Sequence, residues 1–286
     1  MAGIKFHVTA FYKKTARLFH QLFEKHAFSI ISIFTAFVSL AILAIIIWGS
    51  NKGFDLTDEG LYLLKYQNHQ ECFAYFSQFH IIVRKLFGWM GPTILNLRIA
   101  RLILTIASTF IMTYGLVSWL KTFYKMKTET KTGLLIFSIT LIGSFLSYTF
   151  GAQSFSYNHL ISFCLLLSTG LVFIALSRYR ATGTKFLLYF MAGLFTGMAV
   201  FIKITSALPF ILIITVYIYL HHKKIKGKGT AISLASLYTG IGAFILIYFL
   251  SISSLNDYMQ NFGEITKAST REPGNYTLGF YIKDTA

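Results

Sequence analysis

Seven long apolar runs constrain this chain more than any other feature of its sequence. A helix of about 20 apolar residues crosses the hydrocarbon core of a bilayer, and it satisfies its own backbone polar groups there. We therefore predict an all-α, polytopic integral membrane protein with about seven transmembrane helices. The predicted spans are residues 28–48, 102–120, 134–150, 160–176, 186–202, 204–220 and 231–252.

The composition excludes two other classes of protein. The chain is 55% hydrophobic and only 13% charged, which is too apolar for an ordinary soluble domain. Its net charge of +16 does not indicate nucleic-acid binding. The cations lie in short clusters between the apolar runs and form no continuous basic face. We expect no nucleic-acid partner, and membrane lipids as the surroundings.

The basic clusters predict the orientation of the spans. If the runs are threaded alternately, four connecting segments on one side carry five, four, three and four of the 26 Lys and Arg residues. The positive-inside rule places such segments in the cytoplasm. The N-terminus is then cytoplasmic, where residues 1–27 form either an amphipathic surface helix or a basic segment with no fold of its own. The four segments are 1–27, 121–131, 178–185 and 223–228.

A long outer loop, residues 49–101, follows the first span. It carries Asp55, Asp58 and Glu59 within five positions, in a chain with only ten acidic residues. Apolar residues at helical spacing predict two interfacial helices in this loop, one after Asp58 and one over residues 73–90. Such a cluster of three carboxylates is typical either of a site at the membrane boundary or of a solvated helix cap.

Several short motifs are arranged in a recognisable order along the chain. An Asp-Glu pair follows the first span, a Gly ends the second interfacial helix, an Arg-containing stretch enters the second span, and a Gly-rich helix ends in a Lys-x-Thr turn. The motifs are Asp58-Glu59-Gly60-Leu61-Tyr62, Leu86-Phe87-Gly88, Leu97-Arg98-Ile99-Ala100-Arg101, Gly193 to Gly197, and Lys203-Ile204-Thr205.

In this order and topology the chain resembles the GT-C glycosyltransferases, in particular the branch of protein O-mannosyltransferases and bacterial aminoarabinose transferases. The likeness covers most of residues 28–252, which correspond to the family's seven-helix module. Family members usually continue beyond seven helices. We therefore expect residues 253–286 to be an incomplete outer segment, and the chain to be a fragment, a short variant or one part of a complex.

The resemblance implies inverting transfer of a sugar at the outer face of a bacterial plasma membrane. The donor would be a polyprenyl-phosphate sugar, and the acceptor a hydroxyl of a lipid, glycan or protein. Asp58 is the candidate general base, with Glu59 as the second carboxylate. No dedicated acid is needed, because cations can stabilise the leaving phosphate.

The candidate phosphate-binding cations are Lys203, Arg98, Arg101, Arg84 and Lys85. Arginine binds phosphate through a planar fork of donors, whereas lysine acts as a point charge. Lipid-headgroup anchoring explains the two arginines before the second span equally simply. Lys203 is more informative, since it lies between two apolar runs on the side where the positive-inside rule requires no cation.

The remaining candidates would line the sugar pocket. They are Asp55, Tyr62, Tyr157, Asn158 and His159. Many relatives have an acidic residue where this chain has Asn158, so we assign no metal ligands, although a role for a divalent metal is left open. His69, Glu71, Cys72 and His80 match no zinc spacing.

A second functional class also fits the sequence. A non-catalytic membrane protein that handles or transports lipid-linked sugars would use the acidic stretch as a cap or gate. A transporter is expected to place ionisable groups near the middle of broken helices, but here the acids gather at one surface. That distribution favours chemistry at the surface.

Overall fold

The computed structural model describes residues 2–53, 58–67, 79–91, 93–125, 130–149, 154–178, 183–224 and 229–260. Side chains are described from His26 onward, except those of Asp58, Thr149 and Lys224. Asp55 lies outside the described residues, as do His69, Glu71 and Cys72, and only the backbone of Asp58 is described.

The described chain is helical and contains no strand. Its elements are α1 (Ala2–Gly49), α2 (Asp58–Gln67), α3 (Phe79–Phe87), the 3₁₀ turn η1 (Gly88–Met90), α4 (Ile94–Tyr124), α5 (Thr130–Thr149), α6 (Tyr157–Ser177), α7 (Gly183–Ile202), α8 (Ile204–Lys224) and α9 (Thr230–Ser251).

Seven of the described helices are long and apolar enough to cross a membrane, and each covers all or nearly all of one of the predicted spans. The prediction of an all-α, polytopic integral membrane protein is therefore confirmed. The two predicted short helices are present as α2 and α3, although α3 begins at Phe79. Residues 73–78, which the prediction included, lie outside the described part.

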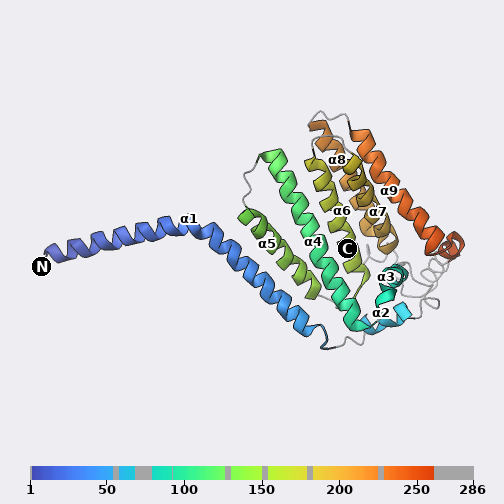
Figure 1. The fold of residues 1–286 in the computed structure, drawn as a ribbon, viewed down its shortest axis with the longest axis horizontal. Coiled ribbons are helices and arrows are strands. Elements are labelled where there is room, and N and C mark those ends of the chain that lie inside the picture. Colours follow the sequence, from blue (N-terminus) through green and yellow to red (C-terminus); the bar gives the residue numbers. More distant parts are fainter. Residues whose placement is uncertain are drawn as a thin grey trace, which may run out of the picture.

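The seven long helices pack in an order that departs from the sequence at α5 and at α8. α1 packs against α5, α5 against α4, α4 against α6, α6 against α7 and α7 against α9, while α8 lies against α6, α7 and α9 (Figure 1). The N-terminal part of α1 extends away from this bundle as a continuous helix (Figure 1). The helices alternate in direction, so α4, α6 and α8 begin at the same end. We call this the α2 end, because α2 and α3 lie there.

Glycines allow the closest contacts in the bundle. A Cβ at Gly193 of α7 would lie about 3.0 Å from the Cα of Gly240 of α9 and would overlap the Leu237 carbonyl. Gly115 of α4 and Gly170 of α6 meet in the same way. Small residues allow two helix backbones to approach closely, which stabilises helix pairs where no hydrophobic driving force exists.

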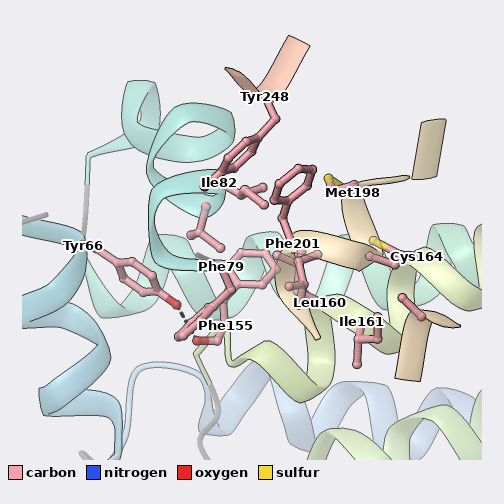
Figure 2. Packing of buried hydrophobic residues seen from close by; sticks show 14 of the residues in the cluster. Tyr66, Phe79, Ile82, Phe155, Leu160, Ile161, Cys164, Met198, Phe201 and Tyr248 are labelled. Atoms are coloured by element: carbon pink, nitrogen blue, oxygen red, sulfur yellow. Dashed lines mark hydrogen bonds between the residues drawn. The ribbon is translucent and has the colours of Figure 1, made fainter. Parts of the chain in front are cut away.

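A buried apolar cluster attaches α2 and α3 to the bundle. Phe79 and Ile82 of α3 pack with Tyr66 of α2 and with residues of α6, α7 and α9 (Figure 2). The Tyr66 hydroxyl donates a hydrogen bond to the carbonyl of Phe155, the second residue before α6. The two short helices are thus fixed against the ends of the long helices.

The second span begins earlier than the sequence indicated. We predicted a start at residue 102, but α4 begins at Ile94, so Arg98 and Arg101 lie within the helix and are 2% exposed. The Thr93 side chain caps this helix by accepting from the Asn96 amide at 3.2 Å. The two arginines interrupt the apolar run, so the sequence did not show that the helix begins before them. Both are accommodated inside the protein because they contact buried partners.

Candidate functional site

Glu59 and Arg98 form a buried ion pair at the α2 end. Arg98 Nε donates to Glu59 Oε1 at 3.0 Å, and Arg98 Nη2 donates to Glu59 Oε2. Only 1% of Glu59 is exposed. A buried charge is stable only when it is paired and hydrogen-bonded. This pair therefore fixes the first turn of α2 against the second turn of α4.

The remaining donors of Arg98 bind backbone carbonyls at the end of α1. Its Nη1 donates to Ser50 and Lys52, and its Nη2 also donates to Gly53. An arginine side chain has five N–H donors, and the five described hydrogen bonds engage them all. Arg98 thus joins α1, α2 and α4 and has no N–H left for a phosphate.

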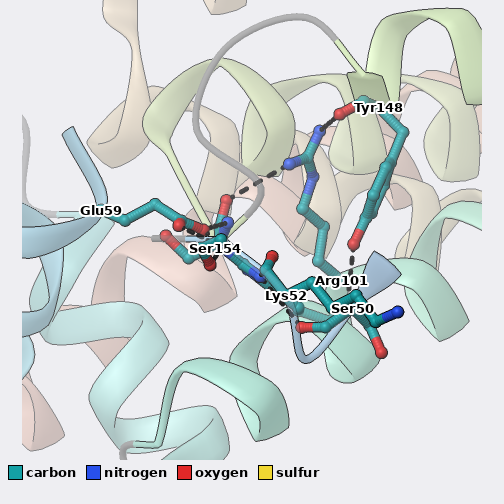
Figure 3. Close-up of polar contacts among 8 residues, drawn as sticks. Ser50, Lys52, Glu59, Arg101, Tyr148 and Ser154 are labelled. Atoms are coloured by element: carbon teal, nitrogen blue, oxygen red, sulfur yellow. Dashed lines mark hydrogen bonds and ion pairs between the residues drawn. The ribbon is translucent and has the colours of Figure 1, made fainter. Parts of the chain in front are cut away.

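Arg101 lies one helical turn further along α4. Its Nη2 donates to the Tyr148 carbonyl at 2.9 Å and its Nη1 to the Ser154 carbonyl at 3.5 Å, and the guanidinium lies 4.1 Å from the centre of the Tyr148 ring (Figure 3). The Ser154 amide in turn donates to Glu59 at 2.7 Å. Arg101 therefore contacts the end of α5 and the segment before α6, and Ser154 in that segment contacts both Arg101 and Glu59.

A second polar group lies where α7 meets α8. Lys203 is the single residue between these helices, and its Nζ donates to Asn158 Oδ1 at 2.9 Å. The same ammonium lies 5.1 Å from the centre of the Tyr157 ring, within the range of a cation–π interaction. Lys203, predicted to bind phosphate, is therefore in contact with Asn158 and Tyr157, which were predicted to line the sugar pocket.

Aromatic rings connect this group to α2. Phe79 packs edge-on against Tyr157 with 6.0 Å between the ring centres, and against Tyr62 with 5.3 Å. Burial is the main cause that raises the pKa of the nearby Tyr66 hydroxyl well above its usual value, and Tyr62 raises it further, while Arg101 opposes the shift. Tyr66 is thus a neutral hydrogen-bond donor at ordinary pH.

The other predicted cations have different surroundings. Arg84 donates to the carbonyls of Tyr66 and Gln67, both at 2.6 Å, and so satisfies the C-terminal end of α2. Lys85 is exposed at the surface of α3. His159 Nδ1 hydrogen-bonds with Ser156 Oγ at 2.6 Å, and His159 also lines a cavity between α4, α5 and α6.

Sequence reasoning missed several residues of the site. Ser154, Tyr148 and Tyr66 hold the arginines and α2 in place, but hydroxyl residues at the ends of apolar runs have no distinctive sequence signal. The two carboxylates predicted as a catalytic pair also differ in setting. Glu59 is held by Arg98, whereas Asp58 is the first residue of α2.

No group of three or more His, Cys, Asp or Glu side chains that could hold a metal occurs among the residues that the structure describes. No protein-family model, curated protein or solved structure matches this chain.

Proposed function

We propose that this chain is a membrane glycosyltransferase that moves a sugar from a polyprenyl-phosphate donor to an acceptor hydroxyl, with inversion. The observation that carries the proposal is the convergence of its candidate residues at the α2 end. Glu59, Arg98 and Arg101 meet in one hydrogen-bonded group, and Lys203, Asn158 and Tyr157 meet in a second. The start of α6 belongs to both.

Asp58 is the general base in this proposal. The buried Glu59–Arg98 pair immobilises the first turn of α2, of which Asp58 is the first residue. A carboxylate carried by this backbone position can accept the proton of the acceptor hydroxyl as that oxygen attacks the anomeric carbon. Glu59 is then a positioning residue, since its two oxygens accept from Arg98 and from the Ser154 amide.

The leaving phosphate requires positive charge. Lys203 is partly exposed and can contribute a point charge while it keeps its contact with Asn158. Arg101 contributes a guanidinium from the start of α4, whereas the donors of Arg98 are engaged elsewhere. Tyr62, Tyr157, Asn158 and His159, together with Asp55, are the proposed contacts of the sugar.

The α2 end would face the outside of a bacterial plasma membrane. Residues 1–27 and the connecting segments at the opposite end, where α4, α6 and α8 end and α5 and α7 begin, together carry 16 of the 26 Lys and Arg residues. The positive-inside rule assigns that end to the cytoplasm. These cations include Lys121, Lys125, Lys131, Arg178 and Lys223.

The proposal is tested by transfer from radiolabelled polyprenyl-phosphate hexoses and pentoses to membrane acceptors. Lys203→Gln should lower kcat/KM for the donor by about tenfold, which corresponds to the loss of one interaction of about 1.4 kcal/mol with the leaving phosphate. Lys52→Gln is the control, because Lys52 is an exposed lysine at the same end that lies over Trp48. Unchanged kinetics in Lys203→Gln would remove Lys203 from the site, and no transfer by the wild type would contradict the function.

A further inference from the structure

A groove runs between α5 and α6, and its floor is α4. Both outer helices pack against α4, and a cavity of about 560 Å³ lies between them. This volume is within the usual range of small-molecule sites. We call it the α5–α6 groove. It lies inside the part of the bundle that spans the membrane.

The groove exists because its walls are made of small side chains. Gly143, Ser144 and Ser147 of α5 face Ser162 and Thr169 of α6 across it. Large apolar side chains at these positions would fill this space. The sequence pattern of Ser, Thr and Gly within two apolar spans is the signal that could have predicted it.

The hydroxyl groups do not make the groove strongly polar. Thr105, Thr140, Ser162 and Thr169 each donate to a carbonyl four residues earlier in their own helix, at 2.7 to 2.9 Å. Such hydrogen bonds consume the hydroxyl donor. The threonine methyl groups, Phe163 and the leucines of α6 complete the lining, so the wall suits a hydrocarbon chain.

One end of the groove is charged. Arg101, Tyr148 and His159 line it where α4 and α6 begin and α5 ends, at the α2 end. Thr169 lies ten residues beyond His159 along α6, and a rise of 1.5 Å per residue makes this distance about 15 Å. The groove therefore runs from the level of Arg101 to about the middle of the bilayer.

An apolar groove with a guanidinium at its outer end is complementary to a lipid with one chain and an anionic head. Guanidinium groups bind phosphate oxygens through charge-assisted hydrogen bonds. A cavity of about 560 Å³ between two neighbouring helices suits one chain better than the two chains of a phospholipid.

We propose that the α5–α6 groove binds a single-chain lipid phosphate, with the phosphate at Arg101 and the first isoprene units between α5 and α6. The inference that this lipid phosphate is the sugar donor rests on the proposed function. The sugar would then lie beside His159 and the adjacent Asn158, which holds Lys203.

Photolabelling of the full chain tests this site without any transfer reaction. The probe is geranylgeranyl phosphate with a diazirine in its chain, added to the protein in phosphatidylcholine nanodiscs. Labelled residues are identified by mass spectrometry. We expect labels on α5 and α6, competition by unlabelled geranylgeranyl phosphate, and about tenfold weaker competition by geranylgeraniol, which lacks the phosphate.

Two glycines of α5 provide matched variants. A Cβ at Gly143 or at Gly133 would meet no atom within 4 Å, so the first atom of a new side chain fits at either position. Only Gly143 lines the groove. Gly143→Phe should reduce labelling by about tenfold, whereas Gly133→Phe should leave it unchanged.

Equal labelling of Gly143→Phe and the wild type would overturn the proposal. Competition by phosphatidylglycerol as strong as that by geranylgeranyl phosphate would overturn the choice of a single-chain lipid. Groove labelling without sugar transfer would support the lipid-phosphate site and remove the transferase function. Transfer without groove labelling would place the donor elsewhere and remove this site alone.

Discussion

Arg98 and Glu59 neutralise each other inside the protein, where either charge alone would be costly. Their pairing connects the ends of α1, α2 and α4 through one side chain. Burying such a pair is not strongly stabilising in itself, because both ions lose their hydration. Its effect is directional, since only one placement of α2 satisfies both oxygens of Glu59 and the donors of Arg98.

Removing one member of the pair should therefore destabilise the protein. Glu59→Gln leaves the Arg98 charge buried without a counter-charge, and we expect a loss of about 3 to 5 kcal/mol in the free energy of unfolding. Denaturant titration in mild detergent measures this loss, with the exposed Lys85→Gln as the control. The double variant Glu59→Leu/Arg98→Met should recover stability, and a Glu59→Gln protein as stable as the wild type would contradict a structural role.

Tyr66 should make the stability depend on pH in alkaline solution. Its pKa in the folded protein is raised by burial above the unfolded value of about 10. The stabilisation is fully present below pH 10 and is lost as the pH rises toward the folded pKa, because the unfolded chain releases this proton first. Tm should fall above about pH 10.

Tyr66→Phe separates this effect from other alkaline titrations. At neutral pH the free energy of unfolding of the variant should be lower by about 1 kcal/mol, because the hydrogen bond to the Phe155 carbonyl is lost. Its Tm should then fall less steeply than that of the wild type above pH 10. Parallel pH profiles for the two proteins would show that Tyr66 does not contribute.

At the scale of helices, the spans could be predicted from the sequence, but some of their ends could not. Continuous apolar runs of sufficient length located all seven helices. The start of α4 was missed because Arg98 and Arg101 interrupt the apolar pattern, and only the fold shows that Glu59, Tyr148 and Ser154 surround them. Local sequence carries no information on such distant partners.

The candidate site was predictable to a similar degree. Lys203, Asn158 and Tyr157 were selected from a break between two spans and from a short turn, and they lie in contact. Their contact depends on α6 packing against α7, which no local pattern specifies. The α5–α6 groove was not predicted. The Ser, Thr and Gly residues of its walls are visible in the sequence, but the space between them depends on how three helices pack.

The glycine contacts make a direct prediction about helix packing. Gly193→Ala would force the backbones of α7 and α9 apart, because its Cβ would overlap the Leu237 carbonyl. We expect the free energy of unfolding to fall by about 1 to 3 kcal/mol, as it does at other overpacked positions. Gly133→Ala is the matched control, since open space surrounds that position, and it should be neutral or slightly stabilising.

Unfolding curves of the two variants in the same detergent provide the comparison. A Gly193→Ala protein with the stability of Gly133→Ala would mean that α7 and α9 do not pack as closely as described.

At the scale of the whole molecule, the account depends on which end faces outward. A Cys72→Ser background leaves Cys164, which is fully buried in α6, as the remaining native cysteine. Single cysteines then replace two exposed residues, Asn51 at the α2 end and Lys125 at the opposite end. An impermeant maleimide should label Asn51→Cys in intact cells, and Lys125→Cys only after permeabilisation. The reverse pattern would place the site in the cytoplasm.

The central claim is that a carboxylate at the start of α2 catalyses sugar transfer. The most direct measurement compares transfer from polyprenyl-phosphate sugars by the wild type, by Asp58→Asn and by Asp257→Asn at matched membrane expression. Asp257 is an exposed carboxylate beyond α9 and serves as the control. We predict that transfer falls by about a hundredfold or more in Asp58→Asn and is unchanged in Asp257→Asn. Equal transfer by Asp58→Asn and the wild type would contradict the account.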